Sequence, residues 1–168
     1  MDEKTKRIIK EVLPFVIVIA VVLLFKSFIM TPVQVQGDSM EPTLNEGDIL
    51  ILNKVSYKLH GIKRFSIVVI DNDGTNLIKR VIGLPGETVK VENNKLFIDG
   101  KLVEQDFLEK KQITEDFEIT LEDGYYFVMG DNRNISLDSR SLGPFHKSKI
   151  KGTASFVIFP FNRIGGKN

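Results

Sequence analysis

Three short stretches of the sequence contain residue types that suit acyl-transfer chemistry. The first, "GDSMEPTL" (37–44), places Ser39 at the centre of a turn-prone loop. Gly37 frees the backbone and Pro42 stiffens the turn that follows, so the loop could hold the serine Oγ and nearby backbone N–H groups in a fixed arrangement. A nucleophile beside an oxyanion hole needs that arrangement. The alternative is an ordinary surface turn, which uses the same residue types.

A serine nucleophile needs a base, and Lys79 is the candidate. In "NLIKRVIGL" (76–84) it shares one face of a predicted strand with Leu77 and Val81. Apolar surroundings disfavour the charged amine, so its pKa should fall from about 10.4 toward a value at which the neutral amine accepts a proton. The alternative is an edge-strand lysine whose amine reaches water. Arg80 faces the other side and is expected to anchor a carboxylate.

The chain's two histidines and its lack of cysteine narrow the chemistry. His60 and His146 lie in polar contexts without a recognisable motif, so both are predicted to be surface residues. The absence of cysteine excludes disulfides, thiol nucleophiles and Cys-ligated metals, and no H-E-x-x-H pattern indicates a zinc hydrolase. The 23 basic and 22 acidic residues are interspersed, which argues against a nucleic-acid partner.

The third stretch, "GDNRNISLDSR" (130–140), packs two residues each of Asp, Asn, Ser and Arg after an apolar strand. This density predicts a hydrogen-bonded network that fixes a loop, in which Asp138 pairs with Arg140 and Ser136 orients another polar side chain. A solvated surface loop is the alternative.

The elements that must position these stretches are predicted to be strands, because short apolar or alternating runs separated by turn signals fill the chain after residue 30. Asp99-Gly100 predicts a type I′ hairpin, and Asn93-Asn94 a second tight turn. The acidic and basic stretch 104–123 is predicted to be an exposed loop or a small excursion from the sheet. The predicted strands are 48–57, 65–71, 76–84, 87–94, 95–103, 124–131 and 152–161.

The amino-terminal segment predicts one transmembrane helix. Residues 1–11 carry four basic side chains and 12–30 are almost entirely apolar. Nineteen helical residues span about 28 Å, close to a hydrocarbon core of roughly 30 Å. A cleavable signal peptide is the rival, but no Ala-x-Ala follows the apolar run. A helix packed on the core of a soluble domain would be apolar along one stripe, whereas this run is apolar on every face. The positive charges place 1–11 in the cytoplasm and the domain 31–168 outside.

Together the three stretches resemble type I signal peptidases, membrane-anchored serine proteases of the Ser-Lys dyad class. "GDSMEPTL" is similar to the family's nucleophile box and "KRVIGLPGE" (79–87) to the box with the general-base lysine. "MGDNRNISLDSRSLGP" (129–144) is similar to the Gly-Asp-Asn-Arg box, and "GTASFVIFPFNRIG" to the closing segment. The boxes occur in the family's order from the anchor almost to the last residue.

The resemblance implies a mostly β fold, an antiparallel β-sheet catalytic domain on one amino-terminal transmembrane helix, without metal or organic cofactor. It also implies roles for the matching residues. Ser39 attacks the peptide bond that follows a signal peptide, and neutral Lys79 takes its proton. Ser136 hydrogen-bonds the lysine, Asp138 and Arg140 form a structural ion pair, and Asp131 meets Arg80.

One position departs from the family pattern. Some members place a serine two residues before the nucleophile, where its hydroxyl helps to hold the oxyanion, but this chain has Gly37 there. Backbone N–H groups, that of Ser39 and one near Gly37, must then carry more of the stabilisation.

The expected partners are signal-peptide-bearing preproteins, cut after small residues, and the lipid bilayer of the plasma membrane. Ser39 is nine positions after Met30, and this length of chain reaches no more than about 30 Å, so the nucleophile is expected to stay near the outer membrane surface. The run "SFVIFPF" could contact the membrane interface, although a core strand is the favoured interpretation.

A specialised processing peptidase and a non-catalytic membrane-tethered module remain alternative functions. A self-cleaving repressor-type protease is disfavoured because a membrane anchor stands where its DNA-binding domain would be.

Overall fold

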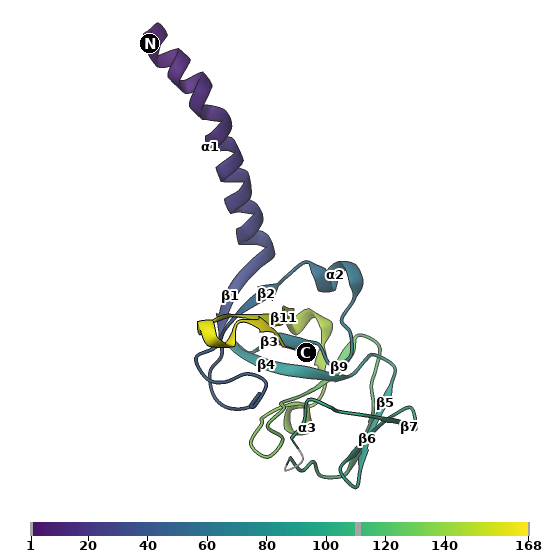
Figure 1. Cartoon of the computed structure of the whole chain (residues 1–168). Helices are drawn as coiled ribbons and strands as arrows, with labels where there is room; N and C mark the ends of the chain where they lie inside the picture. Colours follow the sequence, from purple (N-terminus) through teal and green to yellow (C-terminus); the bar gives the residue numbers. More distant parts are fainter. Residues whose placement is uncertain (1, 110–111, 168) are drawn as a thin grey trace.

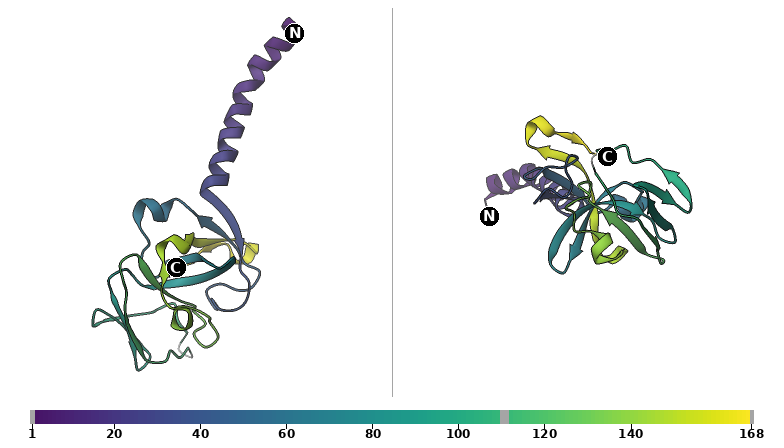
Figure 2. Two further views of the ribbon diagram at one scale, coloured as in Figure 1. Left: turned by 180° about the vertical axis from the view of Figure 1, so that it is seen from behind. Right: turned by 90° about the horizontal axis from the view of Figure 1, so that it is seen from below.

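The computed structural model describes residues 2–109 and 112–167. A long helix projects from a β domain, with the amino terminus at its far end (Figures 1 and 2). The helix α1 spans Glu3–Ile29 and leads directly into the first strand, β1 (Met30–Gln34). The other helical elements in the described residues are short: α2 (Ser56–His60), α3 (Ser139–Leu142), η1 (Lys147–Lys149) and η2 (Phe161–Arg163).

Within the described residues the strands form two antiparallel sheets, which confirms the predicted mostly β domain. The larger has eight strands in the order β1-β2-β11-β3-β4-β9-β10, with β12 paired to β11. Its strands after β1 are β2 (Ile49–Asn53), β3 (Ile67–Asn72), β4 (Thr75–Gly83), β9 (Tyr125–Met129), β10 (Phe145–His146), β11 (Ile150–Phe159) and β12 (Gly165–Gly166).

The smaller sheet has four strands in the order β7-β6-β5-β8 among the described residues. These are β5 (Thr88–Glu92), β6 (Lys95–Ile98), β7 (Lys101–Val103) and β8 (Phe117–Thr120). Two-residue turns join β5 to β6 to β7. Asn93, Asn94, Asp99 and Gly100 all have positive φ there, as both predicted tight turns require.

Buried apolar side chains form separate clusters that fix the sheets around the polar stretches. One lies beneath the loop that carries Ser39 and includes Met40 and Leu44. A second includes Val68 and Val81, the neighbours of Lys79 on the paired strands β3 and β4. A third, with Val89 and Phe127, joins the smaller sheet to β9.

The structure differs from the sequence-based assignment at three places, for identifiable reasons. The strand predicted over 48–57 ends at Asn53, whose side chain accepts the N–H of Val55 and turns the chain into α2. The stretch 104–123 contains β8, whose residues alternate half-buried and exposed. The strand β1 was not predicted because it contains Pro32; it lies at the edge of the sheet, where proline is tolerated.

The run "SFVIFPF" is part core strand and part exposed surface. Val157 of β11 is fully buried in the core, but Phe156 and Phe159 are 47% and 46% exposed and Phe161 is 79% exposed. They lie on the hairpin of β11 and β12, in which β11 pairs with β2 in the larger sheet.

The helix α1 contains the apolar run, and the side chains that are described from Val12 to Val22 are exposed. Side chains from 23 to 30 lie outside the described part. Among the residues described, no helix has both the length and the apolar character of a membrane span.

Candidate active site

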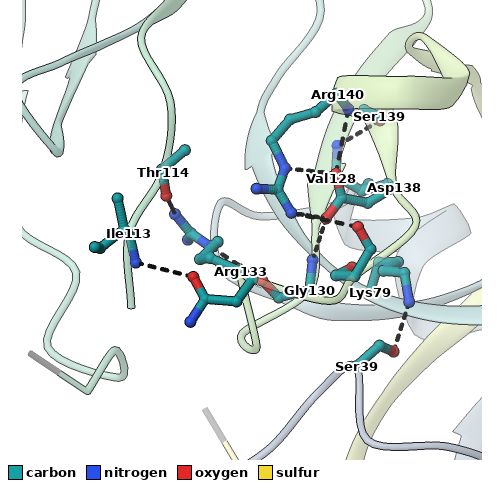
Figure 3. A network of polar contacts seen from close by, with 12 residues as sticks. Ser39, Lys79, Ile113, Thr114, Val128, Gly130, Arg133, Asp138, Ser139 and Arg140 are labelled. Atoms are coloured by element: carbon teal, nitrogen blue, oxygen red, sulfur yellow. Dashed lines mark hydrogen bonds and ion pairs between the residues drawn. The ribbon is translucent and has the colours of Figure 1, made fainter. Parts of the chain in front are cut away.

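Ser39 and Lys79 are brought together from different parts of the fold. Ser39 lies in the loop between β1 and β2, and Lys79 lies on β4. Lys79 Nζ donates a hydrogen bond of 2.7 Å to Ser39 Oγ (Figure 3). The structure therefore brings the two predicted site residues into direct contact.

Lys79 is 3% exposed, so its side chain is buried and does not extend into solvent as the edge-strand alternative required. Its strand pairs with β3, where Val68 lies opposite. Burial lowers the pKa of Lys79 to about 8, although the negative charges of Asp138 and Asp131 oppose the change. A substantial fraction of the amine is therefore neutral at mildly alkaline pH.

The loop that carries Ser39 is held from below by a buried carboxylate. Asp48 is 1% exposed and accepts the N–H of Asn45. Arg163, from the carboxy-terminal hairpin, donates to both oxygens of Asp48 and to the carbonyl of Thr43. The sequence did not reveal this pair, because "NEGD" (45–48) has the composition of a turn.

Arg80 points to the opposite side of β4 from Lys79 and meets Asp131, as predicted. Its Nε and Nη2 donate to Asp131 at 2.9 and 2.7 Å, and both side chains are 0% exposed. Arg80 also donates to Thr43 Oγ1, and its guanidinium lies 4.1 Å from the ring centroid of Phe107. The pair ties β4 to the 130–140 stretch and to the Ser39 loop.

Asp138 and Arg140 also pair as predicted (Figure 3). Arg140 Nε and Nη2 each donate to Asp138 at 2.9 Å, and Asp138 accepts the N–H of Gly130. Burial alone would raise the pKa of Asp138, but hydrogen bonds from Arg140 and Gly130 outweigh it and hold this pKa below its ordinary value. A carboxylate therefore stays charged close to Lys79.

Ser136 differs from the expectation. Its hydroxyl lies near enough to Asp138 to lower that group's pKa, yet Ser136 Oγ is buried without a well-formed hydrogen bond to any described residue. The hydroxyl is close to the carboxylate but is not directed at it as a hydrogen bond requires. The expected bond from Ser136 to Lys79 is not formed.

Gly130 allows this loop to approach the nucleophile closely. A Cβ at this position would overlap the carbonyl oxygen of Ser39 and the hydroxyl of Ser136. Asn132 and Arg133 follow, and neither was assigned a role from the sequence. Asn132 donates to the carbonyls of Asp38 and Ser39, and Arg133 donates to Gly130 O, Thr114 and Gln105. Only the polar density of the stretch signalled them.

A groove of about 660 Å³ leads to Ser39 and Lys79. One wall is residues 31–36, which are β1 and its continuation, and the other is residues 74–79 at the start of β4. In the described residues, β1 pairs only with β2, and β9 pairs with β4 only from Arg80 onward. Both walls therefore present strand edges that no described strand occupies.

The backbone near Ser39 leaves a donor free. Among the described residues, the N–H of Ser39 has no hydrogen-bond partner. Gly37 has a φ of 75°, and no atom lies within 4 Å of where its Cβ would be. No side-chain donor therefore occupies position 37.

The other candidates are less suited to catalysis. His60 and His146 are exposed, as predicted. In the part of the chain that is described, no cluster of three or more His, Cys, Asp or Glu side chains is arranged to hold a metal ion. A serine hydroxyl bonded to a buried amine, at the end of a groove between strand edges, is the arrangement of a serine endopeptidase.

Comparison with known proteins agrees with this class and makes it specific. The family model described as signal peptidase, peptidase S26, matches residues 8–159. Signal peptidase I of Bacillus amyloliquefaciens is 44% identical over 161 residues, 88% of this chain and 87% of the relative. Signal peptidase I S of Bacillus subtilis (strain 168) is 40% identical over 177 residues, 98% of this chain and 96% of the relative. The chain belongs to the signal peptidase family, peptidase S26, and is a serine endopeptidase.

A solved structure supports the fold of the catalytic domain. The crystal structure of a signal peptidase I from Enterococcus faecalis V583 matches with a TM-score of 0.51 and 33% sequence identity. The match covers 55% of this chain and 95% of that one.

Proposed function

We propose that this protein removes signal peptides from exported preproteins, with Ser39 as nucleophile and Lys79 as general base. The observation that carries the proposal is the 2.7 Å contact between Lys79 Nζ and Ser39 Oγ, with the amine buried and its pKa lowered to about 8. The names of the relatives support the substrate class.

The reaction begins with the neutral form of Lys79. Its amine takes the proton from Ser39 Oγ as the oxygen attacks the carbonyl carbon of the scissile peptide bond. The carbonyl oxygen becomes an oxyanion, and the free N–H of Ser39 is the proposed donor to it. The C–N bond then breaks, and Lys79 returns the proton to the leaving amine. Water, deprotonated by Lys79, hydrolyses the acyl-enzyme.

The neighbouring charges are proposed to support this cycle. Asp138 and Asp131 stabilise the ammonium that forms when Lys79 accepts the proton, while burial favours its neutral form. Arg140 and Arg80 keep the two carboxylates in place. Ser136 remains a proposed supporting residue; it packs against Gly130, beside the Ser39 carbonyl.

The substrate is proposed to bind as an added strand. An extended peptide in the groove would hydrogen-bond to the open edges of residues 31–36 and 74–79. Buried apolar side chains, among them Val35, Met40 and Ile78, line the same groove. We propose that they form the shallow pockets that select small residues before the cut.

The proposed function includes attachment to the membrane. We propose that residues 12–30 anchor the chain in the plasma membrane, with residues 1–11 in the cytoplasm and 31–168 outside. The apolar sequence of this segment and the exposure of its described side chains on all sides support the anchor. The exposed Phe156, Phe159 and Phe161 are proposed to contact the bilayer surface beside it.

The substrate class is tested with a preprotein that contains an Ala-x-Ala site. The detergent-solubilised full chain should release the mature protein with a single new amino terminus after the second alanine. A preprotein with phenylalanine in that position is the matched control and should remain uncut. Equal cleavage of both would refute the proposed specificity.

The orientation is tested separately, because the chain contains no cysteine. Thr5→Cys and Lys101→Cys each introduce one thiol at an exposed position. In intact cells a membrane-impermeant maleimide should label position 101 and not position 5. Labelling only at position 5, or at neither position in cells and both after lysis, would contradict the proposed topology.

A further inference from the structure

The peptide group between Asp38 and Ser39 is held by a side chain from a distant part of the sequence. Asn132 Nδ2 donates a hydrogen bond of 3.2 Å to the carbonyl oxygen of Asp38. In the described residues the only cis peptide bonds precede Pro42 and Pro160, so this peptide is trans. In a planar trans peptide the carbonyl and the N–H point in opposite directions. The backbone N–H of Glu41 donates to the same oxygen at 3.1 Å. The two bonds to Asp38 O therefore set the direction of the Ser39 N–H, and Asn132 supplies the one that comes from outside the loop.

The same residue holds the next peptide group. The backbone N–H of Asn132 donates a hydrogen bond of 3.1 Å to the carbonyl oxygen of Ser39. Asn132 therefore donates to the peptide planes on both sides of the Ser39 Cα. The Ser39 N–H itself has no partner in the described chain.

We propose that Asn132 is a positioning residue for the oxyanion site. Its side chain orients the Asp38–Ser39 peptide so that the Ser39 N–H points at the oxygen on which negative charge develops. A hydrogen bond to the carbonyl also polarises the peptide group and makes its N–H a stronger donor. This inference rests on the proposed function, because it concerns the same acyl transfer.

In this chain the backbone N–H of Ser39 must supply more of the proposed oxyanion stabilisation. Gly37 supplies no side-chain hydroxyl, and open space surrounds its Cβ position. The direction of the Ser39 N–H then decides how well the oxyanion is stabilised, because a preorganised donor needs no rearrangement during the reaction.

Asn132 is suited to a test because other contacts maintain its loop. Asp131, the preceding residue, is bound to Arg80, and Asp138 is bound to Arg140. The amide of Asn132 is only partly buried, and its bond to Asp38 is exposed. Removal of the amide should therefore leave the fold intact.

The experiment compares Asn132→Ala and the nearly isosteric Asn132→Asp with the parent, in the full chain with an Ala-x-Ala peptide. Both variants keep the backbone bond and lose the side-chain donor. We expect kcat to fall about 10-fold to 100-fold, somewhat less than when an oxyanion donor is removed outright. KM should stay within about twofold, since ground-state binding does not use this donor. Asn134→Ala, an exposed asparagine two residues away, should behave as the parent.

A second readout separates positioning from general loosening of the site. A peptide boronic acid forms a tetrahedral adduct with a serine and places an oxygen where the oxyanion forms. Its affinity should fall in Asn132→Ala in parallel with kcat, while an uncleavable peptide with proline after the cut site should bind as it does to the parent. The midpoint of the pH profile should not move, because Asn132 is uncharged and makes no hydrogen bond to Lys79 in the described chain.

Several results would overturn the inference. They are a kcat equal to the parent in both Asn132 variants, a rise in KM with kcat unchanged, or equal losses for the boronic acid and the uncleavable peptide. If the parent cleaves and Asn132→Ala cleaves equally well, the inference fails and the proposed function stands. If the parent is no more active than Ser39→Ala, the proposed function fails and this inference fails with it.

Discussion

Lys79 Nζ lies 2.7 Å from Ser39 Oγ, although the two residues are 40 positions apart in the sequence. The loop between β1 and β2 supplies the hydroxyl, and β4 supplies the amine. Arg80 joins β4 to the 130–140 stretch through Asp131 and to the Ser39 loop through Thr43 Oγ1. The Asp138–Arg140 pair lies within the 130–140 stretch and holds its conformation. The chemistry therefore depends on the sheet that brings these segments together.

The first prediction concerns the pH dependence of cleavage. Because the base must be neutral and burial lowers the pKa of Lys79 to about 8, kcat/KM should rise with pH and reach half of its plateau near pH 8. A pH profile with an Ala-x-Ala peptide measures the midpoint. A midpoint near 10.5, the ordinary value for lysine, would contradict a buried base.

The second prediction concerns stability. Burial lowers the pKa of Lys79 in the folded state, so folded Lys79 binds fewer protons than unfolded Lys79 between about pH 8 and pH 10.5. Stability from this group is therefore greatest above pH 10.5 and is lost as the pH falls to 8. Lys79→Met should stabilise the protein at pH 7 by on the order of 2 kcal/mol, and the gain should shrink toward pH 10.5.

Denaturant unfolding of the parent and Lys79→Met at pH 7 and pH 10 measures this effect. A Lys79→Met variant less stable than the parent at both pH values would show that the amine contributes to folding instead of opposing it. Lys101→Met, on the exposed strand β7, is the control and should change little at either pH.

The third prediction concerns the ion pair between Arg80 and Asp131, both 0% exposed. Asp131→Asn leaves a buried guanidinium without its counter-charge, and we expect a loss of about 3–5 kcal/mol in the free energy of unfolding. Asp73→Asn is the control. Asp73 pairs with Lys149 at a surface site where the aspartate is 90% exposed, so a change within about 0.5 kcal/mol is expected. Equal losses of unfolding free energy in Asp131→Asn and Asp73→Asn would contradict the predicted difference between the buried and the exposed ion pair.

The fourth prediction concerns Gly130. In Gly130→Ala the new methyl would overlap Ser39 O and Ser136 Oγ, so the 130–140 stretch must move away from the nucleophile. We expect cleavage to fall at least about 100-fold, since small misplacements of catalytic groups are costly. Gly86→Ala is the control, because open space surrounds that position and only its positive φ opposes a side chain. Full activity in Gly130→Ala would exclude the close packing described here.

Several side-chain positions in this site could be predicted from the sequence because they depend on strand alternation and on short turns. The alternation in "NLIKRVIGL" predicted the opposite faces of Lys79 and Arg80, and the structure confirms the burial of one and the carboxylate partner of the other. Asp138 and Arg140 are two positions apart, so their pairing required only a turn. The tight turns at 93–94 and 99–100 were confirmed for the same reason.

The remaining features depend on tertiary contacts without a local signal. Asp48 meets Arg163 across 115 positions, and Asn132 meets Asp38 across 94. The strand β8 owes its place to pairing with β5, which outweighs the charged character of its surroundings. The expected bond between Ser136 and Lys79 came from the family resemblance, and this structure places that hydroxyl beside Asp138.

The most direct test of the account is cleavage of one Ala-x-Ala preprotein by the parent, Ser39→Ala, Lys79→Ala and Lys79→Arg, with Lys101→Ala as a surface control. The account predicts cleavage by the parent and by Lys101→Ala only, because Ser39 supplies the nucleophile and arginine keeps its charge and cannot accept the proton. Cleavage by either Lys79 variant at a rate near the parent's would contradict the role of Lys79 as the base, and cleavage by Ser39→Ala would contradict the nucleophile itself.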